Sequence, residues 1–155
     1  MTVGIVGLGL IGGSMAKSIK ARTAHTVFGC DLDQETMMMA RMCGAIDAPL
    51  TAENLKECDL VLVAIRPAAA VKWVKEHAEG IRRDAILVDL CGVKRAVVRE
   101  LAPVAEQYGF AYICLLYTSD AAGPRARRLY RRDGQPVCGR VHDPYAGQAH
   151  GYAAA

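Results

Sequence analysis

Residues 4–16 of the chain read GIVGLGLIGGSMA, and the glycines in this stretch decide the fold. Gly7, Gly9 and Gly12 have the spacing G-x-G-x-x-G, directly after the apolar run Thr2–Val6 and directly before apolar residues that recur at helical spacing. We therefore predict a strand, a tight turn and a helix. In such a turn the first glycine permits the sharp bend, the second lets the backbone approach a pyrophosphate, and the third allows close packing of helix on strand.

Short apolar runs alternate with amphipathic segments along the rest of the chain up to residue 113. Further strands are predicted at residues 27–30, 60–65, 85–90 and 110–113. Helices are predicted at residues 10–21, 34–43, 67–79 and 93–108. The continuous apolar runs LVLVAI and AILVDL are typical of strands that are buried on both faces of a parallel sheet. This alternation predicts a doubly wound parallel sheet, an α/β fold of the Rossmann type.

The glycine turn and the residue that ends the second strand together predict a dinucleotide site. A diphosphate would lie on the free amides and the positive dipole end of the first helix. Asp31 follows Gly12 by 19 residues, at the position where a carboxylate accepts hydrogen bonds from the adenosine ribose. No arginine stands next to Asp31 to receive a ribose phosphate, so we predict NAD rather than NADP. Capping of the next helix, the alternative role for a carboxylate here, fits Asp33 better.

Ligands in open parallel sheets lie beyond the carboxyl ends of the strands, near the point where the strand order reverses. This indicates the two turns that follow LVLVAI and AILVDL, in which Ala64 and Ile65 would flank the nicotinamide ribose. Arg66 contacts a phosphate or a substrate carboxylate, or it is a solvated loop residue. Lys94 is either a surface lysine or a catalyst. The predicted cofactor-binding residues are Gly7, Leu8, Gly9, Leu10, Ile11, Gly12, Asp31, Ala64, Ile65, Arg66, Cys91 and Gly92.

Length and composition limit the possible classes of protein. A chain of 155 residues with 52% hydrophobic residues suits one compact domain. The longest apolar run is shorter than the roughly 20 residues that cross a bilayer, so we expect a cytoplasmic protein with no membrane partner. The six cysteines form no C-x-x-C pair, which favours reduced thiols and no metal site. No Ser/His/Asp or Cys/His arrangement is available in residues 1–113, so hydride transfer by the cofactor is the economical chemistry.

Residues 1–113 resemble the nucleotide-binding domain of the prephenate dehydrogenases. The resemblance rests on GIVGLGLIGGSMAKSIK, VFGCDLD, GAID, CDLVLVAIRP and ILVDLCGVKRAVVREL. It implies an enzyme of tyrosine biosynthesis that uses NAD to take a hydride from prephenate, with loss of carbon dioxide and formation of 4-hydroxyphenylpyruvate. It also implies a homodimeric parent with a helical second domain that is absent here. Many members have a serine where this chain has Gly92, which puts one polar contact in doubt.

Residues 114–155 differ from the rest of the chain in composition. They contain six arginines and no lysine, and glycine and proline interrupt any period between residues 123 and 140. The segment CLLYTSDAA at residues 114–122 resembles the translation of a transposase sequencing adapter. We therefore expect an NAD-binding domain at residues 1–113, followed by an artefactual or disordered tail in which residues 114–141 are mostly foreign to the natural gene.

The last 14 residues, HDPYAGQAHGYAAA, resemble the H-P-x-A-G segment that follows the sixth strand in the family, with Asp143 added. In the family the histidine of this segment holds the substrate hydroxyl and assists its deprotonation. His142 is therefore the candidate catalytic residue. The basic segment RARRLYRR is interpreted as solvated and disordered, with an arginine-rich nucleic-acid arm as the alternative.

The sequence therefore predicts a fragment of an NAD-dependent prephenate dehydrogenase that is inactive by itself. Two alternatives stay open. One is arogenate dehydrogenase, or another Rossmann dehydrogenase with a helical second domain. The other is a non-catalytic module that senses NAD.

Overall fold

A computed structural model describes residues 1–114, apart from the side chains of Lys94 and Arg95. The strands are β1 (Thr2–Val6), β2 (Thr26–Cys30), β3 (Ala48–Pro49), β4 (Leu60–Val63), β5 (Ile86–Asp89) and β6 (Ala111–Cys114). The helices are α1 (Leu10–Arg22), α2 (Gln34–Met42), α3 (Ala52–Leu55), α4 (Pro67–His77) and α5 (Lys94–Tyr108), with the short 3-10 helix η1 at Ala78–Gly80. The described residues contain no helix that is both long and apolar enough to span a membrane.

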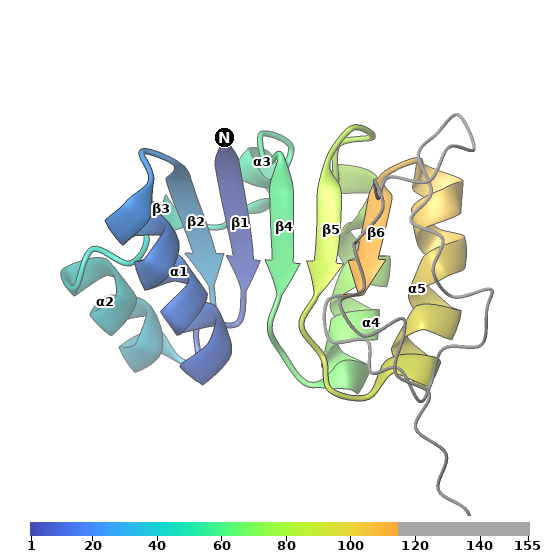
Figure 1. Ribbon diagram of the computed structural model, residues 1–155, viewed down its shortest axis with the longest axis horizontal. Coiled ribbons are helices and arrows are strands. Elements are labelled where there is room, and N and C mark those ends of the chain that lie inside the picture. The colour runs from blue at the N-terminus through green and yellow to red at the C-terminus, as the bar shows by residue number, and fades with distance from the viewer. Residues whose placement is uncertain (115–155) are drawn as a thin grey trace, which may run out of the picture.

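The strands form a single parallel sheet in the order β3-β2-β1-β4-β5-β6. Along this order the chain runs outward from β1 to β3 and then returns to start again at β4. Figure 1 shows α1 and α2 beside the β1–β3 half of the sheet and α4 and α5 beside the β4–β6 half. The order therefore reverses between β1 and β4, and the predicted Rossmann-type fold is confirmed.

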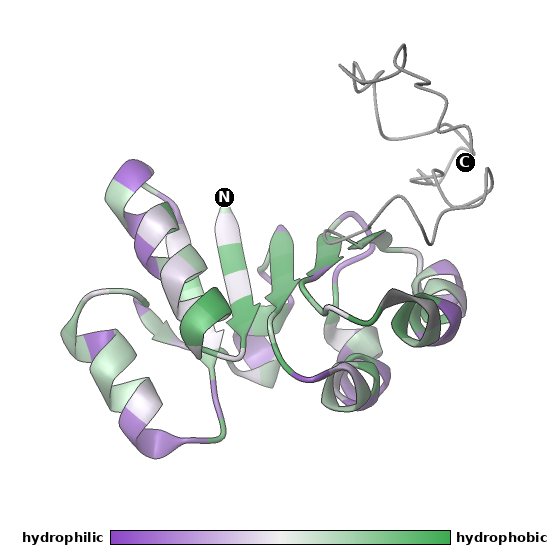
Figure 2. Cartoon of the chain, turned by 60° about the horizontal axis from the view of Figure 1, so that its bottom comes forward, coloured by the Kyte–Doolittle hydropathy of each residue, from purple (hydrophilic) through white to green (hydrophobic). Residues whose placement is uncertain are grey.

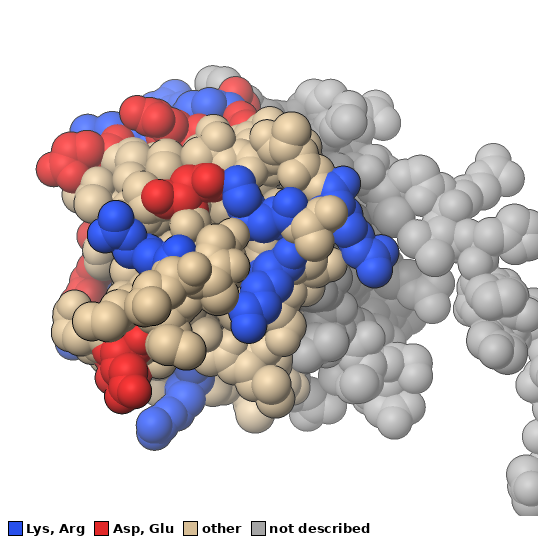
Figure 3. Space-filling view, turned by 90° about the vertical axis from the view of Figure 1, so that its left-hand side faces the viewer, with Lys and Arg blue, Asp and Glu red and all other residues tan. Residues whose placement is uncertain are grey.

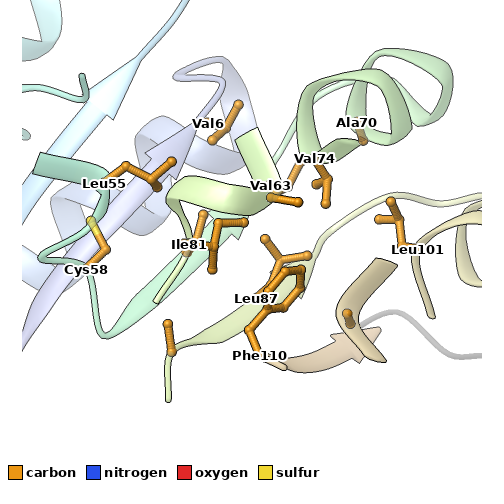
Figure 4. Packing of buried hydrophobic residues seen from close by; sticks show 14 of the residues in the cluster. Val6, Leu55, Cys58, Val63, Ala70, Val74, Ile81, Leu87, Leu101 and Phe110 are labelled. Atoms are coloured by element: carbon orange, nitrogen blue, oxygen red, sulfur yellow. The ribbon is translucent and has the colours of Figure 1, made fainter. Parts of the chain in front are cut away.

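Two hydrophobic clusters cover the two faces of the sheet. The first cluster joins the sheet to α4 and α5 (Figure 4). It contains Val63 of β4, Leu87 of β5, Phe110 just before β6, Val74 of α4 and Leu101 of α5. The second cluster joins β1 and β2 to α1 and α2, with members Val3, Ile5, Ala16, Val27 and Ala40. Strand segments are accordingly coloured as mainly hydrophobic in Figure 2, whereas the helices also show hydrophilic residues.

The inner strands are buried on both faces because successive side chains alternate between the two clusters. Along β5, Leu87 belongs to the α4–α5 cluster and Val88 to the other cluster. Leu90 and Cys91, just after the strand, continue the same alternation. This explains why both predicted inner strands read as continuous apolar runs.

The structure corrects the predicted elements in three places. β3 and α3 were not predicted, because β3 has two residues, one of them Pro49, and α3 is a single turn capped by Thr51. β4 ends at Val63 rather than at residue 65. The amide of Ala64 still donates to Val6 O, but β1 turns away at Gly7, so the next residues have no strand to pair with on that side. His77, the last residue of α4, lies half-buried, and its ring stacks on that of Trp73 with 4.4 Å between the ring centroids.

Replacement of Gly12 tests the close packing of α1 on β1. A Cβ at this position would lie 1.8 Å from Gly7 O, whereas a Cβ at Gly9 has no atom within 4 Å. Gly12→Ala is therefore expected to lower the free energy of unfolding by about 3 kcal/mol, at the upper end of the usual cost of overpacking. Gly9→Ala is the matched control and should change it by less than about 0.5 kcal/mol.

Thermal unfolding followed by the fluorescence of Trp73, the single tryptophan of the chain, measures both variants. Equal melting temperatures for Gly12→Ala and the unmodified chain would contradict the packing described here.

Candidate functional site

The turn between β1 and α1 has a conformation that requires glycine at its first position. Gly7 has φ +88°, and its amide donates to Cys30 O at 2.8 Å. A Cβ on Gly7 would lie 2.4 Å from the Ile65 side chain and 2.7 Å from Ala64 O. The turn is thus in close contact with the residues that follow β4.

The first turn of α1 presents an electropositive surface at this edge of the sheet. Intrahelical bonding starts with the amide of Gly13, which donates to Gly9 O at 2.8 Å, so the amides of residues 10–12 precede it. Residues 10–13 contain no acidic side chain that would neutralise the helix dipole. Gly9 is exposed, and the space where its Cβ would stand is open. An anion such as a diphosphate therefore has access to these amides.

Asp31 connects the end of β2 to the glycine turn. Its Oδ2 accepts a hydrogen bond from the amide of Leu8 at 2.7 Å, and its Oδ1 accepts one from the amide of Asp33 at 3.0 Å. The side chain is only partly buried. Since each carboxylate oxygen has two lone pairs, both oxygens retain the capacity to accept from a hydroxyl. The Asp31 carboxylate can therefore bind two neighbouring hydroxyls while it holds the turn.

Asp33 performs the capping role that the sequence assigned to it. Its carboxylate accepts from the amide of Thr36 at 2.9 Å and from the Thr36 hydroxyl at 2.6 Å, at the start of α2. The hydroxyl first, and the amide second, hold the pKa of Asp33 below its usual value. Capping thus falls to Asp33 and leaves Asp31 available for another role.

The turn between β4 and α4 forms the opposite wall of the site. Ala64 lies so close to α1 that a Cβ on Gly12 would be 3.1 Å from the Ala64 Cβ. Arg66 is the N-cap of α4, is exposed, and precedes Pro67 at the first helical position. Its exposed position is compatible with both predicted roles, contact with an anion and solvation.

The turn between β5 and α5 is tied to the turn after β4. Cys91 is buried, and its thiol donates to Ile65 O at 3.4 Å. Gly92 is exposed, with open space where its Cβ would stand. The turns after β1, β4 and β5 therefore converge at one edge of the sheet, where the structure brings together the predicted residues Gly7 to Gly12, Asp31, Ala64 to Arg66, Cys91 and Gly92.

Asp89, which the sequence did not single out, is fully buried at the end of β5. Its Oδ1 accepts from the amide of Cys91 at 3.0 Å, and its Oδ2 accepts from the Tyr112 hydroxyl at 2.5 Å. Burial first, and the bond to the Asp89 carboxylate second, raise the pKa of Tyr112 well above its usual value. The signal available in the sequence was a single carboxylate in the otherwise apolar run AILVDL.

Two other predicted residues are not placed at this site. His142 lies outside the described residues, as does the side chain of Lys94. Cys30, Cys43 and Cys58 form no disulfide within the described part of the chain, and burial raises the pKa of Cys30 and of Cys58 to about 11. On the face of the domain shown in Figure 3, acidic and basic side chains are interspersed with uncharged ones.

A family model described as the nucleotide-binding domain of prephenate dehydrogenase matches residues 15–125. This span is most of the chain. The chain belongs to this family. The match begins inside α1, so the glycine turn at Gly7 to Gly12 is an observation independent of it.

Curated relatives show the same relationship. The chain is 31% identical over 111 residues to a probable mitochondrial 3-hydroxyisobutyrate dehydrogenase of Dictyostelium discoideum. The aligned region covers 69% of this chain and 34% of the relative. The chain is also 32% identical over 101 residues to prephenate dehydrogenase of Bacillus subtilis, and this aligned region covers 63% of the chain and 27% of the relative. The chain thus spans about a third of the length of the relatives it matches.

Solved structures share the fold of this family member. Prephenate dehydrogenase from A. aeolicus, in complex with hydroxyphenyl propionate and NAD+, has a TM-score of 0.64 and 25% identity over 72% of this chain and 40% of that one. Synechocystis arogenate dehydrogenase has a TM-score of 0.63 and 24% identity, over 72% of this chain and 40% of that one. At this identity the second similarity concerns the fold alone.

The Asp89–Tyr112 hydrogen bond leads to a pH-dependent prediction. Because the pKa of Tyr112 is raised in the folded state, the bond stabilises the protein at pH values below about 10, the pKa of an unfolded tyrosine, and the stabilisation falls at higher pH. Tyr112→Phe should lower the free energy of unfolding at neutral pH by about 1.5–3 kcal/mol, as expected for a bond to a charged group. The difference from the unmodified chain should shrink above pH 10, when measured by urea denaturation at each pH. A difference that stays constant up to high pH would refute this role.

Proposed function

We propose that this chain is the NAD-binding domain of a prephenate dehydrogenase. The observation that carries the proposal is the Asp31 carboxylate, which is anchored to the Leu8 amide beside the open position at Gly9. The carboxylate can accept two ribose hydroxyls and the start of α1 can bind a diphosphate, and both lie at the glycine turn, as a dinucleotide site of this fold requires. Family membership and the NAD complex of the A. aeolicus relative support the same cofactor.

The residues of the site fit each part of the adenosine diphosphate. The diphosphate would lie against the amides of residues 10–12, since Gly9 leaves that approach open. Asp31 would accept the two ribose hydroxyls, and its negative charge would repel a phosphate at the same position. Leu32, which is fully exposed next to Asp31, offers an apolar surface for the adenine ring. This arrangement favours NAD over NADP.

The nicotinamide half would lie between the turns after β4 and β5. Bound NAD supplies a hydride acceptor. The backbone of Ala64 and Ile65 would flank the nicotinamide ribose, and Cys91 and Gly92 would border the ring. Arg66 would reach a phosphate or the substrate carboxylate from the start of α4. Each of these residues orients the dinucleotide at the edge of the sheet, where a substrate can approach it.

The substrate side of the reaction is proposed from the family resemblance. A prephenate dehydrogenase removes a hydride and carbon dioxide from prephenate to give 4-hydroxyphenylpyruvate, and His142 is the proposed counterpart of the histidine that assists deprotonation. Residues 1–113, together with Cys114 at the end of β6, would form the domain, and the tail after Cys114 would not contribute to it. We propose a homodimer for the parent enzyme and no turnover by this chain alone, since about two thirds of each relative lies outside the matched region.

Calorimetric titration of the chain with NAD tests the binding function. We expect one saturable site per chain, in a sample whose thermal unfolding shows that it is folded. The absence of binding in such a sample would reject the proposal. Binding without reduction of NAD in the presence of prephenate is the expected result for the chain alone, whereas reduction with arogenate and not with prephenate would contradict the proposed substrate.

The cofactor preference depends on Asp31. Asp31→Ala should weaken the binding of NAD about tenfold to a hundredfold, the effect of losing one or two hydrogen bonds to a charged group. It should weaken NADP much less, because the same change removes the repulsion of the ribose phosphate. Titration of both dinucleotides into the variant and into the unmodified chain measures the ratio. Equal losses for the two would exclude Asp31 from the ribose site.

Gly9 tests the diphosphate separately from the ribose. A Cβ at Gly9 points into open space, so Gly9→Val should preserve the fold while its side chain occupies the approach to the α1 amides. We expect NAD and NADP to lose affinity alike in this variant, by at least about tenfold. Unchanged affinity for both in the titration would place the diphosphate elsewhere.

A further inference from the structure

Asp89 is the one charged residue that is buried among the residues the structure describes. Removal of a carboxylate from water is costly, and an apolar side chain of similar size is often as stable in such a place. A buried carboxylate with two directed hydrogen bonds is therefore better explained by a requirement for position than by stability. Two of its donors come from different segments: the Cys91 amide lies in the turn after β5, and the Tyr112 hydroxyl comes from β6.

The first of these bonds fixes the turn after β5. The amide of Cys91 is two residues beyond Asp89, so its bond to Oδ1 closes a local turn that determines where Gly92 lies. The Cys91 thiol in the same turn donates to Ile65 O at 3.4 Å. Through Cys91, the Asp89 carboxylate therefore sets the position of the β5–α5 turn relative to the β4–α4 turn.

The second bond fixes the carboxylate itself. Tyr112 lies in β6, which pairs with β5 in parallel register so that Asp89 stands opposite Cys114 and Val88 opposite Ile113. The Tyr112 hydroxyl reaches Oδ2 from this neighbouring strand at 2.5 Å. The phenol is protonated in the neutral range like any tyrosine, and its raised pKa keeps it a donor at higher pH as well. The Asp89 carboxylate is thus held by Tyr112 of β6 through Oδ2, and it holds the β5–α5 turn through the bond of Oδ1 to the Cys91 amide.

We propose that Asp89 and Tyr112 are positioning residues that hold the β5–α5 turn against the β4–α4 turn and so shape the part of the site that receives the nicotinamide half of the dinucleotide. The inference rests on the proposed NAD-binding function. Neither residue is assigned a contact with the dinucleotide, because both act through Cys91. The adenosine half, which lies at the turns after β1 and β2, should not depend on them.

The test compares NAD with ADP-ribose, which lacks only the nicotinamide. Tyr112→Phe should weaken the binding of NAD about threefold to tenfold in calorimetric titration and leave the affinity for ADP-ribose unchanged. Asp89→Asn, which keeps the volume but replaces one acceptor oxygen by a donor, should have the same pattern with a larger effect on NAD. Tyr108→Phe, at the end of α5, is the matched control and should change neither affinity.

Saturation-transfer NMR supplies a readout that a loss of stability would not produce. In the unmodified chain both the adenine and the nicotinamide protons of NAD should receive saturation from the protein. In Tyr112→Phe the nicotinamide signals should fall relative to the adenine signals, at a temperature where Trp73 fluorescence shows the variant to be folded. Asp89→Asn is interpreted only if it passes the same folding check, and Tyr112→Phe decides the question if it does not.

The outcomes separate this inference from the proposed function. Equal losses for NAD and ADP-ribose, or an unchanged ratio of nicotinamide to adenine signals in Tyr112→Phe, would overturn the positioning role and leave NAD binding intact. The same holds if the unmodified chain transfers saturation to adenine but not to nicotinamide. If the folded, unmodified chain binds neither NAD nor ADP-ribose, the proposed function itself fails.

Discussion

The lack of side-chain volume at Gly7 and Gly12 is the constraint on which the rest of this structure depends. The position of a Cβ on Gly12 lies 1.8 Å from Gly7 O, and that of a Cβ on Gly7 lies 2.4 Å from the Ile65 side chain. Only with glycine at both positions can α1 begin directly above β1 while the turn after β4 packs beside it. This close approach brings the amide end of α1 to the point where the strand order reverses.

The carboxylates at this edge have different environments, and these environments separate their roles. Asp33 is exposed and caps the start of α2 by accepting a hydrogen bond from the amide of Thr36. Asp31 is partly buried, holds the glycine turn through Leu8 and retains the capacity to accept further hydrogen bonds. Asp89 is fully buried and directs both of its oxygens to groups of the protein. Residues of one chemical type thus differ with their exposure and their partners: Asp33 caps a helix, whereas Asp31 is proposed to bind the ribose and Asp89 to position a turn.

Membership of the prephenate dehydrogenase nucleotide-binding family places this domain among dehydrogenases whose named substrates differ. The matched relatives include a 3-hydroxyisobutyrate dehydrogenase and a prephenate dehydrogenase, and in each the matched region is about a third of the protein. A domain shared across such enzymes is expected to bind the common cofactor, whereas the remaining length provides the contacts that distinguish substrates. The geometry described here accordingly bears most directly on the dinucleotide.

The sequence by itself determined the elements whose signals are local: the glycine turn, the apolar inner strands, the cap at Asp33 and hence the order of a doubly wound sheet. Spacing and periodicity suffice for these because each depends on residues within one or two turns of chain. Only the tertiary structure decided features that join distant segments. Asp89 and Tyr112 are 23 residues apart and meet because β5 and β6 are neighbours, and the two-residue β3 exists only because β2 offers it hydrogen-bond partners. Such contacts leave no periodic trace in the chain, since their energy comes from pairing and burial that exist only after folding.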